Sequence, residues 1–167
     1  VPNLLMHAVA LREGQANAAY LTAARNQVQW IVSNKPATDS LMTKGQRMSE
    51  HILVPALTEF MMRDPQTTVT GVDAWLSNWT DTVISRSANY WDFRKYTDTI
   101  WTPENVPGGH PWWNEPGNIA GFPASALAAA TRIADPAKVA RLRQISVSQL
   151  DQVFGRNPYN RHFCFRA

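Results

Sequence analysis

The sequence contains almost no cysteine. Cys164 is the one cysteine among 167 residues, so no disulfide can form within the chain. The sequence has no Cys-x-x-Cys pair and no Cys/His spacing of the kind that holds a structural zinc ion. An apolar core therefore has to hold the fold together, and we expect no metal and no cofactor.

Long apolar runs and clustered positive charge are missing as well. No apolar run reaches the roughly 18 residues that a membrane helix requires. The 16 Lys and Arg outnumber the 13 Asp and Glu only slightly, and they are scattered along the chain, whereas nucleic-acid binding usually needs a clustered basic face. We expect neither a membrane nor a nucleic acid as a partner.

The composition is that of a globular domain. Hydrophobic residues make up 44% of the chain and charged residues 17%. A chain of this length can remove roughly 70% of its unfolded surface from water. We therefore treat residues 1–167 as a single domain.

Apolar residues at steps of three and four predict an all-α fold of six helices. Local signals support several boundaries: Asp135 followed by Pro136 is a strong helix start, and Gly155 is a stop. Pro55 is expected to kink the third helix or to mark its first turn. The predicted helices cover about residues 4–11, 16–33, 45–62, 72–90, 120–133 and 135–155.

The six helices are expected to form three antiparallel hairpins, of which the first and third look alike. Residues 3–36 and 118–158 each give a helix of small residues, a turn and a longer helix, and they close on Asn34-Lys-Pro36 and Asn157-Pro158. Arrays of such hairpins either stack into an open solenoid or close into a toroid, and their terminal faces stay open without a neighbour. The repeat is consistent with both architectures.

Between these helices, residues 92–117 lack helical periodicity and are rich in proline, glycine and tryptophan. Long connections of this kind inside compact domains are usually either functional or disordered. The tryptophans favour function, so we predict a ligand-binding loop.

Two segments resemble the family 9 glycoside hydrolases and their six-hairpin relatives. The run Gln149-Leu-Asp-Gln-Val-Phe-Gly-Arg-Asn-Pro158 is similar to a helix that closes on Leu-Gly-Arg-Asn-Pro beside the substrate groove. Asn114-Glu115 followed by Asn118-Ile-Ala-Gly-Phe122 resembles the family's Asn-Glu and Asn-Ala-Gly-Phe segment. The order of the two segments is reversed here, and the family's aspartate-rich motif has no counterpart.

This resemblance implies a divergent branch of polysaccharide-degrading enzymes, hydrolase or lyase, that are secreted or periplasmic. It implies an (α/α)6 toroid in which residues 1–167 form the C-terminal half. The remaining hairpins would come from the rest of the chain or from a partner subunit, and the ligand would be an oligo- or polysaccharide.

Glu115 is the candidate catalytic residue. Inverting cleavage of a glycosidic bond needs a protonated acid and a carboxylate base roughly 6.5 to 9.5 Å apart. In the resembling family the matching Glu is the general acid, and desolvation in an aromatic loop would raise the pKa of Glu115 and keep it protonated. A turn or capping role is the alternative, and Asp92 is the other loop carboxylate considered as a partner.

The candidate substrate-binding residues are aromatic or basic. Trp101, Trp112 and Trp113 can stack on sugar rings or instead fill the loop layer of the toroid. His110 can share a proton with Glu115 or serve as a simple hydrogen-bonding residue.

Arg156, Arg161 and His162 follow the last helix and are expected to reach sugar hydroxyls. The alternative function is a non-catalytic helical-repeat module that binds a saccharide or a protein through the tryptophan-rich loop.

Overall fold

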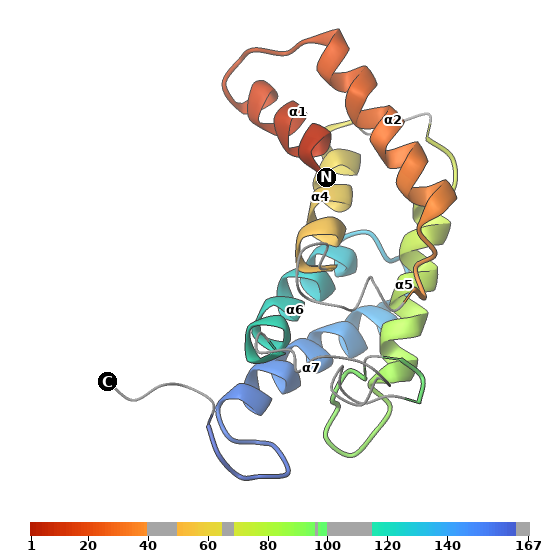
Figure 1. The fold of residues 1–167 in the computed structure, drawn as a ribbon. Coiled ribbons are helices and arrows are strands. Elements are labelled where there is room, and N and C mark those ends of the chain that lie inside the picture. Colours follow the sequence, from red (N-terminus) through yellow and green to blue (C-terminus); the bar gives the residue numbers. More distant parts are fainter. Residues whose placement is uncertain (40–49, 65–68, 96, 100–114, 163–167) are drawn as a thin grey trace, which may run out of the picture.

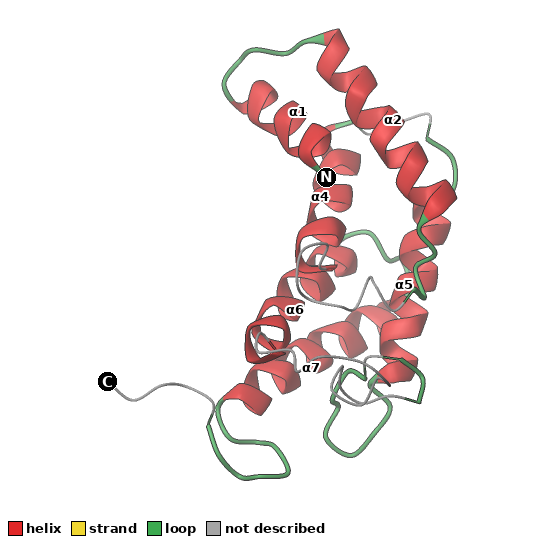
Figure 2. Ribbon diagram, viewed as in Figure 1, coloured by secondary structure: helices red, strands yellow, loops and turns green. Residues whose placement is uncertain are grey.

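The computed structural model describes residues 1–39, 50–64, 69–95, 97–99 and 115–162 (Figure 1). Within these residues all regular secondary structure is helical, with no strand, so the all-α prediction is confirmed (Figure 2). The helices are α1 (Pro2–Arg12), α2 (Ala18–Asn34), α4 (Glu50–Arg63), α5 (Val72–Arg86), α6 (Glu115–Ala130) and α7 (Pro136–Val153).

The helix starts at α2 and α7 follow from side-chain caps. The Asn17 side chain accepts a hydrogen bond from the backbone N of Ala19 at 2.8 Å, and α2 begins one residue after this cap. The Asp135 carboxylate accepts one from the backbone N of Ala137 at 2.8 Å, and Pro136 occupies the first turn of α7. The predicted start of α7 is confirmed.

Three boundaries differ from the prediction. Pro55 lies inside α4, five residues after its first described residue, so it does not mark the first turn. Helix α5 ends at Arg86 instead of residue 90, because the side chain of Asn89 bonds the backbone of Trp91 and Phe93 and turns the chain. The described part of helix α6 begins at Glu115 rather than at residue 120; Pro116 lies in its first turn, where a missing N–H costs little, and Pro123 lies inside the helix.

The helices pack in two rows (Figure 1). Helices α1, α4 and α6 contact one another in that order in the first row, and α2, α5 and α7 do so in the second. Helices α1 and α2 pair as one hairpin and α6 and α7 as another, as the sequence predicts. The middle pair differs, because α4 packs mainly on α6 and α1 while α5 packs mainly on α7.

One apolar core connects both rows. Val28 of α2, Leu57 of α4 and Ile145 of α7 are fully buried in it. At its centre the rings of Trp79 and Phe122 lie 6.2 Å apart, joining α5 to α6. This core fixes the position of the α6–α7 hairpin relative to the rest of the molecule.

Helix α6 approaches α4 closely at Gly121. A Cβ atom at this position would lie 3.2 Å from Cγ of His51, which is tighter than ordinary van der Waals contact. His51 therefore packs against the neighbouring helix, and its partial burial lowers the pKa of its imidazole.

Candidate functional site

Four of the predicted site residues, Glu115, Arg156, Arg161 and His162, lie at one end of the α6–α7 hairpin. These two helices make the most extensive helix contact in the described structure and are joined by the short connection 131–135. Because they run in opposite directions, the first residue of α6 and the last residue of α7 lie at the same end (Figure 1). Glu115 and residues 154–162 therefore share this end.

A buried asparagine fixes the turn that follows α7. The Asn157 side chain is buried, and its Nδ2 donates to the backbone oxygens of Gln152 and Arg161, both at 2.7 Å. Its Oδ1 accepts from the backbone N of Tyr159 at 3.0 Å. Gly155 has φ +118°, a backbone conformation that favours glycine. The turn is thus an ordered element whose exposed side chains project from a fixed backbone.

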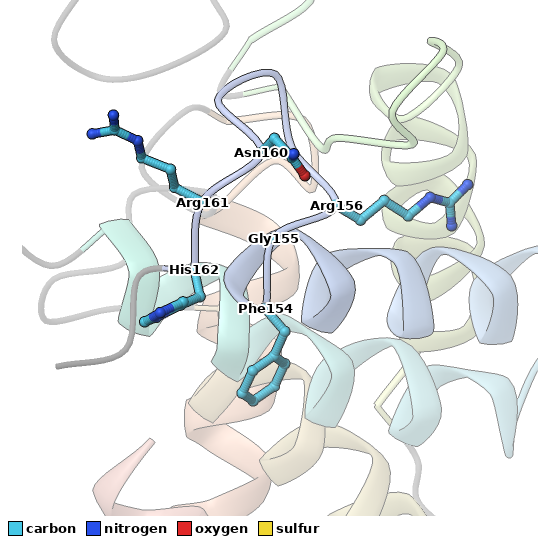
Figure 3. A pocket seen from close by; sticks show the side chains of 6 residues that line it. All are labelled: Phe154, Gly155, Arg156, Asn160, Arg161 and His162. Carbon is cyan, nitrogen blue, oxygen red and sulfur yellow. The ribbon is translucent and has the colours of Figure 1, made fainter. Parts of the chain in front are cut away.

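An open hollow of about 660 Å³ lies within this turn (Figure 3). Phe154 is its apolar wall and is 68% exposed. Arg156 and Arg161 both line it, and their side chains extend away from each other on opposite sides of the turn (Figure 3). The lining residues are Phe154, Gly155, Arg156, Asn160, Arg161 and His162.

The structure therefore brings together three sequence-predicted binding residues, Arg156, Arg161 and His162. Sequence reasoning missed Phe154 and Asn160. The signal available in the sequence for Phe154 was its position: an aromatic residue between the last helical residue and a glycine that ends the helix. Nothing in the local pattern distinguished Asn160, which has φ +49° and lies on the return of the turn.

Asp92, the proposed carboxylate partner, is held in a network on α7. Its Oδ1 accepts from Nη2 of Arg141 at 2.6 Å, and its Oδ2 accepts from Oγ of Ser148 at 3.1 Å and Nε2 of Gln144 at 3.5 Å. Nε2 of Gln149 donates to its backbone oxygen at 2.6 Å. These contacts anchor the segment after α5 to α7. They give Asp92 a structural role, and its catalytic role stays a prediction.

The network also controls the ionisation of Asp92. Burial alone would raise the pKa of its carboxyl group. The hydrogen bonds from Arg141 and Ser148, together with the positive charges of Arg141 and Arg156, outweigh burial and lower the pKa below its usual value. Asp92 is therefore charged at neutral pH.

Replacing Asp92 by asparagine should lower the free energy of unfolding by about 1–2 kcal/mol at pH 7, since a mostly buried ion pair loses one charge. Asparagine tolerates the φ of +52° at this position, so the backbone is preserved. Because the pKa of Asp92 is lower in the folded state, its contribution is present above about pH 4 and is lost on acidification through the folded pKa. Urea unfolding measures this at pH 7 and at lower pH. The free energies of unfolding of wild type and Asp92→Asn should become more similar as the pH falls.

Asp81→Asn is the matched control, because Asp81 also pairs with a cation of α7, Lys138, but at an exposed position. We expect a change within about 0.5 kcal/mol. An equal loss in both variants would contradict the structural role of Asp92.

Glu115 is the first residue of α6, so the prediction of a loop through residue 117 is wrong at that end. His110, Trp101, Trp112 and Trp113 lie outside the described residues.

No protein-family model matches this chain, and neither the curated proteins nor the solved structures include a significant match. Among the described residues, no helix is long and apolar enough to cross a membrane. The same residues contain no group of three or more His, Cys, Asp or Glu side chains arranged to hold a metal ion.

Proposed function

We propose that this chain is a glycoside hydrolase-like domain that binds an oligo- or polysaccharide at the shared end of α6 and α7. Glu115 is the proposed general acid for cleavage of the glycosidic bond. The two sequence segments that resemble six-hairpin glycosidases support this function, together with the all-helical fold.

One observation carries the proposal. The resembling segments are separated along the chain and occur in reversed order, yet the pairing of α6 with α7 puts the start of one beside the end of the other. A groove formed by both segments requires that the two segments lie close together in the fold. It does not require a particular order of the segments along the chain. Reversed order is therefore compatible with a common site.

The chemistry of the hollow suits a sugar. The exposed ring of Phe154 offers a flat apolar surface for the C–H face of a pyranose. Asn160 and the flanking arginines supply hydrogen-bond donors for hydroxyl groups around that ring.

The ends of the two helix rows fit an incomplete array. Leu5, Met6 and Val9 of α1 are about half exposed, although they are large and apolar. Val147 and Leu150 form a similar stripe on α7. We propose that further hairpins, from the remainder of the chain or from a partner subunit, cover these faces as in an (α/α)6 toroid.

Phe154→Ala should weaken binding of a soluble β-glucan oligosaccharide about tenfold, because the variant loses the stacking surface. Titration calorimetry measures this directly. Tyr90→Ala is the matched control, since Tyr90 is an exposed aromatic residue in the segment that follows α5. Equal affinity of wild type and Phe154→Ala would exclude the hollow as the binding site.

A binding module without catalysis is the second candidate. One observation favours it: the carboxylate of Asp92 is paired with Arg141. Saccharide binding without any release of reducing sugar would select this function.

A further inference from the structure

We infer that the hollow after α7 selects a saccharide that carries carboxylate groups, such as a chain of uronic acid residues. This inference rests on the proposed function, because it names the class of saccharide bound at the same site. It comes from the charge and the geometry of the turn.

The residues that line the hollow include positively charged side chains and no acidic one. Arg156 and Arg161 both line it and are exposed, and His162 lies beside them. Between residues 150 and 162 the one acidic residue is Asp151, whose carboxylate lies 3.5 Å from Nη1 of Arg156. This pair is about half exposed and at the long end of ion-pair distances, so an incoming carboxylate can compete for the guanidinium group.

The two arginines are placed to hold an extended ligand. They project in opposite directions from the turn (Figure 3), so they are not arranged to close on one compact anion. A linear chain with an acidic group on successive sugar rings can cross the hollow and meet both. Arginine pairs with carboxylates through two parallel hydrogen bonds, which gives directional recognition of each group.

The backbone beneath these arginines is held in place. Asn157 bonds the carbonyl oxygen of Arg161 and that of Gln152 at the end of α7, so the Cα atoms of the two arginines keep a fixed separation. Phe154 adds a surface for a sugar ring between the flanking charges. This combination of a ring platform and flanking cations favours acidic sugars over neutral ones.

The test compares two ligands of the same length and ring structure: a tetramer of galacturonic acid and its fully methyl-esterified form, which is uncharged. We expect the acidic tetramer to bind at least about tenfold more tightly at low salt, and the difference to shrink as ionic strength rises. Arg156→Ala and Arg161→Ala should each weaken binding of the acidic tetramer about threefold and the double variant about tenfold, and they should weaken binding of the ester less.

Arg143→Ala is the control for net charge. Arg143 is exposed on α7 but lies ten residues before the end of the helix, roughly 15 Å along its axis. Equal losses in Arg143→Ala and Arg156→Ala would overturn the inference, because they would show attraction to overall charge alone. Equally tight binding of a single-stranded oligonucleotide would overturn it for the same reason.

The outcomes separate this inference from the proposed function. If the ester or a neutral β-glucan binds as tightly as the acidic tetramer, the inference is wrong and saccharide binding stands. If the folded protein binds none of these saccharides, the proposed function itself fails.

Discussion

Glu115→Gln is expected to lower the rate of saccharide hydrolysis about 100-fold or more. Removing a general acid from its position typically costs this much, because the leaving oxygen then departs without a proton. Glutamine keeps the size of the side chain and cannot donate a proton as an acid. The measurement is release of reducing sugar from soluble β-glucan and from galacturonate oligomers.

Binding of the same oligosaccharides should stay within about twofold of wild type, because the hollow of residues 154–162 is unchanged. Activity should fall as the pH rises through the pKa of the acid, because a general acid must carry a proton to donate it. Unchanged turnover in Glu115→Gln would remove this residue from the mechanism and leave the binding module.

Phe122→Ala is expected to lower the free energy of unfolding by about 3–5 kcal/mol. Phe122 is fully buried, its ring packs on Trp79, and the guanidinium carbon of Arg94 lies 5.0 Å from its centroid. The truncation opens a cavity where α5 meets α6 and removes the aromatic partner of a buried cation. Urea unfolding followed by far-UV circular dichroism measures the loss.

Phe122→Leu serves as the control, because it keeps most of the buried volume and should cost much less than Phe122→Ala. A loss below about 1 kcal/mol in Phe122→Ala would mean that α6 is not held by this contact. The position of the site at the end of α6 would then need another explanation.

Local signals in the sequence were enough to predict most of the helices. Asp135 caps α7 and leaves no ambiguity about its start, and the periodic apolar residues of α2 put its boundaries within about two residues of the observed ones. Signals of this kind act within one turn of helix, so the sequence shows them directly.

The start of α6 was missed because the residues there are compatible both with a loop and with the first turn of a helix. Pro116 and Gly117 are typical of a loop, but proline in the first turn also begins helices. The packing of α4 on α6 was missed for a different reason. It includes the close approach of Gly121 to His51, which are 70 positions apart in the sequence.

The candidate site was predicted only in part. Arg156, Arg161 and His162 line the same hollow, and they are also close in sequence; their role in binding stays a prediction. The role of Asp92 depends on Arg141, 49 residues away, and no local pattern contains that pairing. The proximity of Glu115 to the turn after α7 likewise comes from the hairpin as a whole.

The two-row arrangement has a consequence for how the molecule loses structure. Among the described helices, α1 contacts α2 and α4. Helices α6 and α7 make the most extensive contact with each other, and they also pack against α4 and α5. In arrays where each unit depends on its immediate neighbours, thermal opening starts at the least supported end. The first hairpin is therefore expected to open before the α6–α7 hairpin does.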